Sequence, residues 1–429
     1  MEPQEPRRVG IVLAGGGARG AYEAGVLSEL LPQLDRRGVR LTVFLGTSIG
    51  SVNACLFASL AHLDPNEAVR QALAFWRQLD RPAVFRNLLL TAPATLSSYV
   101  AEFVGLPRPR LANLLDTTPL QQTGRLLNFH QLHSNVNEGL VSAVAVVATA
   151  AYSGRSVVFV QAGSDVELPE SDRARALDYV RADLDLPHVL ASSAIPAFFP
   201  AVEVTQPPGA TGWYIDGGVR LNTPIAPALD LGVSHLIVIA THPAVPSPVL
   251  PPDLDRPLPQ PEIDDAAVQL LDAALVDPLI EDVQRLSTVN EMVGRSNQLA
   301  DRLIEIDGQP AEGGETRRNV PYLFFGPHAR EDIGNLAELV YDDRYSGIAG
   351  TLRAVRSPDF PLLRRLVGHG EGPRGGDLLS YFFFDPEFID RSIQLGRQHA
   401  RETFERFPTD DIIWQEGRPR RPNGAFVSP

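Results

Sequence analysis

Lysine is absent from the 429 residues, cysteine occurs once, and no apolar run is long enough to cross a bilayer. A single cysteine, Cys55, excludes an internal disulfide and a cysteine-based zinc site, which favours a reducing compartment. The first residues also lack the apolar core of a signal peptide. The most apolar stretch, residues 140–152, is too short for a membrane span and is rich in Val and Ala, as buried strands are. We expect a cytoplasmic location, with peripheral attachment to a membrane as a further option.

The chain is acidic, since it contains 52 Asp and Glu residues but only 38 Arg residues, which gives a net charge of −14. An acidic chain is poorly suited to wrapping nucleic acid, so we expect no nucleic-acid partner. Apolar residues make up 44% of the chain and charged residues 21%, which is typical of a globular protein.

Short apolar runs alternate with helical patterns along the chain. Residues 9–14 and 41–45 predict two buried strands with a helix between them, and therefore a parallel pair with a right-handed crossover. Residues 140–163 predict a hairpin, and residues 320–325 predict a later strand. This alternation predicts an α/β fold with a mostly parallel sheet.

A glycine-rich run lies between the first predicted strand and the first predicted helix and reads Gly15-Gly16-Gly17-Ala18-Arg19-Gly20. It contains the G-x-G-x-x-G pattern of dinucleotide-binding proteins. Those proteins also need a carboxylate at the end of the second strand, where this chain reads Leu45-Gly46-Thr47-Ser48. The run therefore favours another anion at a helix N-terminus, such as a transient oxyanion, and a nucleotide site is the alternative.

A second motif follows the second predicted strand and reads Gly46-Thr47-Ser48-Ile49-Gly50. A serine on a tight strand-to-helix turn needs small neighbours two residues away on each side, because bulky ones would clash. The pattern thus predicts a nucleophile elbow, although an ordinary glycine-rich loop has the same composition.

Two further motifs lie later in the chain. Asp216-Gly217-Gly218 follows a short predicted strand and is typical either of a hairpin turn or of a general base on an unobstructed loop. Residues 191–200 combine small residues with proline-flanked aromatics, which favours a tightly packed helix that ends at a proline.

In their order and context these four motifs resemble those of the patatin-like phospholipase family, over residues 8–240. The resemblance implies a three-layer α/β/α fold with a mostly parallel central sheet, helical insertions and a helical C-terminal region. We expect a hydrolase domain at residues 8–330, within which residues 67–139 form a helical insertion or a lid candidate. We expect a helical extension packed on the same domain at 331–416, and a frayed tail at 417–429.

The same resemblance implies a serine hydrolase that cleaves carboxylic esters of lipids, of the phospholipase A, lysophospholipase or lipase type. Ser48 would be the nucleophile, and Asp216 would take its proton and later activate water. Arg19 would orient the glycine-rich loop or meet a phosphate, or else be a solvated charge. The remaining implied residues are the oxyanion loop Gly15, Gly16, Gly17, Ala18, Arg19 and Gly20, with N–H donors from Gly16, Gly17 and Ala18, and the supporting glycines Gly46, Gly50, Gly217 and Gly218.

We expect no cofactor and no metal, because the paired aspartates of the chain lack the spaced oxygen ligands of a calcium loop. The expected partner is a lipid ester, with transient contact to a membrane surface. The apolar residues 83–106 fit either a lid or a packed helical pair.

His242 is the rival for the role of base, since it follows Ser48 and Asp216 in the order of a Ser-acid-His triad. We expect a dyad instead, because Asp216 in its D-G-G context already occupies that role in the family. A nucleotide-binding oxidoreductase and a non-catalytic binding protein on the same fold are the two other classes left open.

Overall fold

The computed structural model describes residues 8–79, 124–196, 199–244, 283–293 without 285 and 289, 319–346, 375–407 and 411–416. The lid candidate at 83–106 and the tail at 417–429 lie outside the described residues. The domain boundaries expected from the sequence therefore stay a prediction.

Among the described residues, nine strands form one sheet, in the order β5-β4-β3-β2-β1-β8-β9, and β7 pairs with both β3 and β6. The pairs β1–β2, β2–β3, β1–β8, β8–β9 and β4–β5 are parallel, whereas β3–β4, β3–β7 and β6–β7 are antiparallel. The predicted mostly parallel sheet and the hairpin at 140–163 are thus confirmed. The strands are β1 (Val9–Leu13), β2 (Leu41–Thr47), β3 (Ala143–Ala150), β4 (Ser156–Ala162), β5 (Leu177–Arg181), β6 (Val202–Val204), β7 (Gly212–Asp216), β8 (His235–Ile239) and β9 (Tyr322–Phe325).

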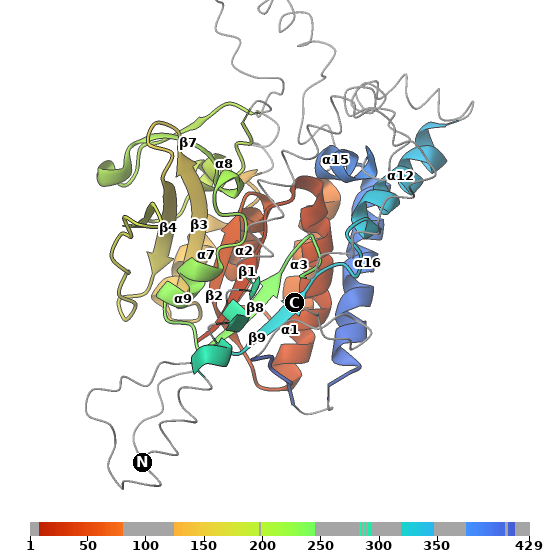
Figure 1. Cartoon of the computed structure of the whole chain (residues 1–429), viewed down its shortest axis with the longest axis horizontal. Coiled ribbons are helices and arrows are strands. Elements are labelled where there is room, and N and C mark those ends of the chain that lie inside the picture. Colours follow the sequence, from red (N-terminus) through yellow and green to blue (C-terminus); the bar gives the residue numbers. More distant parts are fainter. Residues whose placement is uncertain are drawn as a thin grey trace, which may run out of the picture.

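Helices cover both faces of this sheet (Figure 1). The described α-helices are α1 (Gly20–Arg36), α2 (Ile49–Ser59), α3 (Pro65–Gln78), α7 (Phe129–Asn137), α8 (Leu186–Ser192), α9 (Ile225–Asp230), α12 (Asp332–Tyr345), α15 (Gly375–Phe382) and α16 (Pro386–Phe404). Short 3₁₀ helices are η1 (Gly17–Arg19), η2 (Pro208–Ala210) and η3 (Gly217–Val219).

Side chains from the two faces of the sheet pack into two separate hydrophobic cores, because successive side chains of a strand point to opposite faces. In β1, Ile11 and Leu13 join the core formed with α1, α2, α3 and α16, whereas Val12 joins the core that contains α9. The result is a three-layer α/β/α arrangement with a helical C-terminal region, as expected. Pro32 lies inside α1, which nevertheless continues to Arg36.

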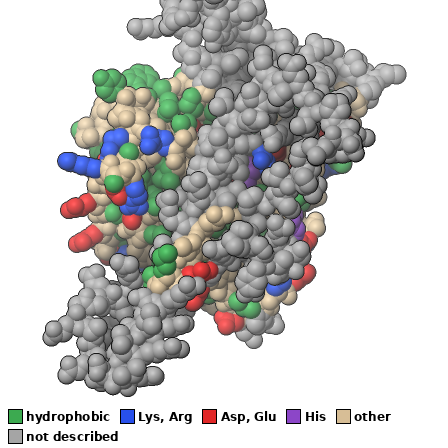
Figure 2. Space-filling view, in the orientation of Figure 1, with side chains coloured by type: hydrophobic (Ala, Val, Ile, Leu, Met, Phe, Trp, Pro, Cys, Tyr) green, Lys and Arg blue, Asp and Glu red, His purple; other side chains and the backbone are tan. Residues whose placement is uncertain are grey.

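Figure 2 shows charged side chains of both signs over the part of the molecule that carries β3, β4 and β7, and others along its lower part. Ion pairs near β5 join Arg155 with Asp178 and Arg175 with Asp230. Among the described residues, none of the helices combines the length and the apolar character that crossing a membrane requires.

Helix α16, from the end of the chain, packs along α1, from its beginning (Figure 1). The two helices approach closely because each has a glycine at the contact. A β-carbon on Gly25 would lie 2.2 Å from the carbonyl oxygen of Ile393, and one on Gly396 would lie 2.2 Å from that of Tyr22. Both obstacles are backbone atoms, so neither helix can accept a side chain there without moving.

This contact predicts that Gly396→Ala destabilises the protein. In an exposed helix the same change would stabilise by about 1 kcal/mol, so a loss of stability isolates the steric effect. We expect a loss of about 1–3 kcal/mol in urea unfolding, the usual cost of overpacking. Gln394→Ala, at an exposed position of the same helix, is the matched control and should be neutral. Equal stability of the two variants would contradict the close packing.

Candidate active site

Ser48 and Asp216 are brought together by the way two strands share one side of β3. β2 pairs with β3 up to Thr47, which lies opposite Val147. β7 then takes the same side of β3 from the other direction and ends with Asp216 opposite Ala148. Because β4 occupies the other side of β3 throughout, the ends of β2 and β7 must meet. Ser48, the residue after Thr47, therefore lies at the junction that Asp216 reaches.

Ser48 has a backbone conformation that L-residues rarely adopt, with φ of 54° and ψ of −127°. Its neighbours explain how the chain can make this turn. A β-carbon on Gly46 would lie 2.1 Å from the carbonyl oxygen of Gly50, and one on Gly50 would lie 2.3 Å from that of Leu13. No side chain fits at either position, because it would collide with backbone atoms. The turn has the strand–turn–helix geometry that presents a serine hydroxyl above a sheet.

The glycine-rich loop lies directly against this serine. A β-carbon on Gly15 would lie 3.1 Å from the β-carbon of Ser48. The Gly15 N–H is already engaged, because it donates to the side-chain oxygen of Asn222 at 3.0 Å. For the N–H groups of Gly16, Gly17 and Ala18 we find no acceptor among the described residues. These three groups can therefore donate to an anion that forms at Ser48.

Asp216 is a buried carboxyl group, with 3% of its surface exposed. Burial raises its pKa to about 7. Hydrogen bonding to the Ser48 hydroxyl and to the Gly218 N–H lowers the pKa, but by less than burial raises it. Its Oδ1 accepts the Gly218 N–H at 2.7 Å, and its Oδ2 has no hydrogen-bond partner among the described residues. A β-carbon on Gly217 would lie 2.3 Å from the carbonyl oxygen of Val147. The D-G-G motif is thus the end of a strand that enters a 3₁₀ turn, and the hairpin interpretation is wrong.

Helix α8 holds both residues in place. Ser192 accepts the backbone N–H of Ser48 at 2.8 Å and donates to the carbonyl of Val147 at 2.6 Å. Two residues later, the carbonyl of Ala194 accepts the N–H of Asp216 at 2.9 Å. The sequence favoured plain packing for this stretch, whereas the structure gives it a direct contact with each member of the pair. The paired serines among small residues were the only signal of that contact.

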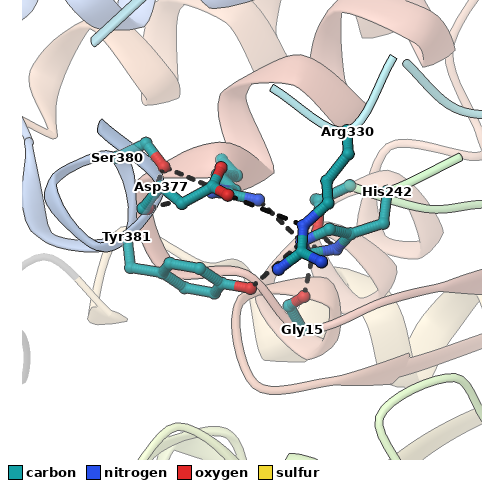
Figure 3. Close-up of polar contacts among 8 residues, drawn as sticks. Gly15, His242, Arg330, Asp377, Ser380 and Tyr381 are labelled. Atoms are coloured by element: carbon teal, nitrogen blue, oxygen red, sulfur yellow. Dashed lines mark hydrogen bonds and ion pairs between the residues drawn. The ribbon is translucent and has the colours of Figure 1, made fainter. Parts of the chain in front are cut away.

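Next to the glycine-rich loop, His242 lies near Asp377, Ser380 and Tyr381 (Figure 3), and Arg19 of the loop joins these side chains. Arg19 has no exposed surface, and its Nη1 donates to His242 Nε2 at 2.8 Å. Because a guanidinium can only donate, His242 Nε2 must be the acceptor, and the ring is neutral. Burial, followed by the charges of Arg19 and Arg330, holds the pKa of His242 well below its ordinary value. His242 is thus committed to Arg19, and Arg19 is not available to a solvent-borne phosphate.

A small apolar pocket opens next to the Ser48 turn. Its wall includes Ile49 and Val52 from α2, Val189 and Leu190 from α8, and Phe384. Ile49 directly follows Ser48, so the pocket lies close to the serine turn.

Other residues of interest lie elsewhere or do not cluster. Cys55 is buried in α2, and burial raises the pKa of its thiol to about 12, so it is unreactive at neutral pH. Within the described part of the chain, no three His, Cys, Asp or Glu side chains are grouped so that they could hold a metal ion. The residues that sequence reasoning missed are Ser192, Asn222, Asp377, Ser380 and Tyr381.

Comparison with known proteins places these features in context. A family model described as "Patatin-like phospholipase" matches residues 11–229, just over half of the chain. Lysophospholipase nte1 of Aspergillus terreus is 42% identical over 59 residues, which are 14% of this chain and 4% of that protein. The crystal structure of VipD from Legionella pneumophila aligns with 92% of this chain and 67% of its own, at 12% identity and a TM-score of 0.30.

The raised pKa of Asp216 predicts how stability depends on pH. The folded state holds the proton up to about pH 7, whereas the unfolded chain releases it near pH 4. Ionisation therefore costs stability as the pH rises from about 4 to 7, by up to about 4 kcal/mol. Asp216→Asn, which is always neutral, should be more stable than the wild type at pH 8, and the gap should shrink at pH 5.

Urea unfolding at both pH values measures this difference. Asp178→Asn is the matched control, and its effect on stability should have the opposite sign. Arg155 lowers the pKa of Asp178, so the ionised carboxylate stabilises the fold and its removal should destabilise it. A stability gap for Asp216→Asn that is the same at pH 5 and pH 8 would show that Asp216 has an ordinary pKa.

Proposed function

The chain belongs to the patatin-like phospholipase family, a family of lipid ester hydrolases, and we propose that it cleaves the ester with Ser48 and Asp216 as a catalytic dyad. The proposal includes an oxyanion hole formed by Gly16, Gly17 and Ala18. One observation carries it. The strained Ser48 turn, the glycine-rich loop and the buried Asp216 carboxyl all meet at one edge of the sheet.

The first half-reaction transfers the acyl group to the enzyme. Asp216 accepts the proton of the Ser48 hydroxyl while the oxygen attacks the ester carbonyl. The negative charge that develops on the carbonyl oxygen is bound by the free N–H groups of the loop. When the tetrahedral intermediate collapses, the carbon–oxygen bond of the ester breaks, and the leaving alcohol takes the proton back from Asp216.

The second half-reaction releases the fatty acid. Asp216, ionised again, removes a proton from a water molecule, and the hydroxide attacks the acyl-Ser48 ester. The intermediate collapses to the free acid, and Ser48 regains its proton from Asp216. A carboxylate of ordinary pKa is a weak base toward a serine hydroxyl, so the raised pKa of Asp216 supports its use in both steps.

The small apolar pocket supports an apolar group as the part of the substrate next to the serine. Its lining is mostly hydrocarbon and includes Ile49, the residue after Ser48. An ester bond over Ser48 would therefore have an apolar surface beside it. The name of the fungal relative, a lysophospholipase, adds lysophospholipids to the phospholipids and other lipid esters that we propose as substrates.

A dyad is favoured over a triad by the surroundings of His242. A catalytic histidine needs one ring nitrogen for the serine and the other for the acid. Here Nε2 accepts from Arg19, and Nδ1 lies 3.3 Å from the Thr241 hydroxyl. Within the described part of the chain, neither nitrogen bonds to Ser48 or Asp216.

Replacement of the nucleophile is the primary test. Ser48→Ala should abolish hydrolysis of p-nitrophenyl butyrate and labelling by a fluorophosphonate, and mass spectrometry of the labelled wild type should map the probe to Ser48. Ser59→Ala is the matched control, since Ser59 is a buried serine at the end of α2 whose hydroxyl donates to the carbonyl of Leu56. Near wild-type hydrolysis by Ser48→Ala, or a probe mapped to another residue, would refute the proposal.

Asp216 as the base predicts the pH profile. The ionised form is the active one, so kcat/KM for a neutral ester should rise with pH and level off above about 7. Asp216→Asn should lose roughly 10²–10⁴-fold in activity and also lose the rising limb. Circular dichroism at each pH checks that the fold is intact. A wild-type profile that is flat between pH 5 and 8 would remove Asp216 from the role of base.

A further inference from the structure

Helix α15, far outside the segment that matches the family model, lies directly on the glycine-rich loop (Figure 3). The contact begins in the backbone. Gly17 has a positive φ of 57°, and a β-carbon there would lie 2.1 Å from the carbonyl oxygen of Tyr381. Only glycine fits at position 17, because any side chain would collide with the carbonyl of Tyr381. The glycine is therefore explained by packing within the protein, and no nucleotide phosphate is needed to account for it.

The side chain of Arg19 completes the contact. Its Nε donates to Ser380 Oγ at 2.7 Å, and its Nη2 donates to both the carbonyl and the Oδ1 of Asp377 at 2.9 Å. The guanidinium also lies over the ring of Tyr381, 4.3 Å from the ring centre. Helix α15 therefore supplies most of the partners of a fully buried cation.

Asp377 provides the negative charge of this contact. Its side chain is 7% exposed, and it lies between two guanidinium groups, because Nε of Arg330 is 3.7 Å from its Oδ2. On the other side, Arg19 binds His242, whose neighbour Thr241 donates to the carbonyl of Gly15 at 3.4 Å. The chain of contacts from Asp377 thus reaches both ends of the loop.

We propose that Asp377 is a positioning residue for the oxyanion hole, and that α15 is consequently part of the catalytic unit. By binding Arg19, Asp377 fixes the loop so that the N–H groups of Gly16, Gly17 and Ala18 point toward Ser48. This inference rests on the proposed hydrolase function.

The loop needs such an anchor because its own residues provide little restraint. Apart from Arg19, its side chains are hydrogen atoms and one methyl group, and glycine has the widest conformational freedom. Donors of an oxyanion hole act only when they are already oriented, because reorientation during the reaction removes their advantage. Loss of the Asp377 charge would therefore affect turnover more than substrate binding.

Asp377→Asn tests the proposal, since it keeps the shape of the side chain and removes the charge. For p-nitrophenyl butyrate we expect kcat to fall by roughly 10–100-fold, with KM within about threefold of wild type. Asp385→Asn is the matched control. Asp385 is a second buried carboxylate of the C-terminal region, 1% exposed and close to Arg344 and Tyr345, but it does not contact the loop. Both variants should lose thermal stability, and only Asp377→Asn should lose kcat.

A double-mutant cycle identifies the route of the effect. If Asp377 acts through Arg19, the pair Arg19→Gln with Asp377→Asn should have a kcat within about threefold of Arg19→Gln alone. A double variant whose losses multiply would overturn the proposal, as would a kcat of Asp377→Asn equal to that of Asp385→Asn. If Asp377→Asn does not fold, Ser380→Ala removes one neutral partner of Arg19 instead, and an unchanged kcat in that variant would also overturn it.

Hydrogen exchange gives a readout that does not depend on activity. Residues 15–20 should exchange faster in Asp377→Asn than in wild type and should be unchanged in Asp385→Asn, whereas equal exchange in all three proteins would overturn the proposal. If the wild type neither hydrolyses esters nor labels at Ser48, the proposed function fails, and the exchange experiment still decides whether Asp377 holds the loop.

Discussion

The strained backbone of Ser48 is the constraint on which the rest of the site depends. A residue held in such a conformation costs on the order of 1–3 kcal/mol, so it persists only where the surrounding structure fixes it. Here the restraint comes from three directions. Gly46 and Gly50 allow the turn, and Ser192 of another helix binds the Ser48 N–H. The serine backbone is thus held both by its neighbours in the turn and by a residue distant in sequence.

The acid is placed by the same sheet. β2 and β7 approach one another along one side of β3, so the strand that ends before Ser48 meets the strand that ends at Asp216. The meeting point is buried, and burial raises the pKa of the carboxyl group to about 7. One geometric arrangement therefore brings the two groups together and also raises the pKa of the carboxyl group, as the proposed role of Asp216 as a base requires.

The C-terminal region completes the structure around the N-terminal motifs. α16 packs on α1 through a pair of facing glycines, and α15 surrounds the guanidinium of Arg19. The first contact buries α1, and the second fixes the residue at which the glycine-rich loop enters that helix. This arrangement also explains why His242, which has the right position in the chain for a triad, is used elsewhere. Its Nε2 is the acceptor for Arg19.

The sequence by itself determined the α/β class, the mostly parallel sheet and the order of the motifs, because glycine requirements and apolar periodicity are local and leave a pattern in the chain. It left Asp216-Gly217-Gly218 open between a turn and an acid, and it favoured plain packing for the stretch around Ser192. Only the tertiary structure excluded the hairpin and gave Ser192 its bonds to Ser48 and Val147, since both depend on which distant segments pack at the end of β2. The contact of Arg19 with Asp377 joins residues 358 positions apart. A single buried ion pair between distant segments has no periodicity and no spacing rule, so nothing in the sequence could have indicated it.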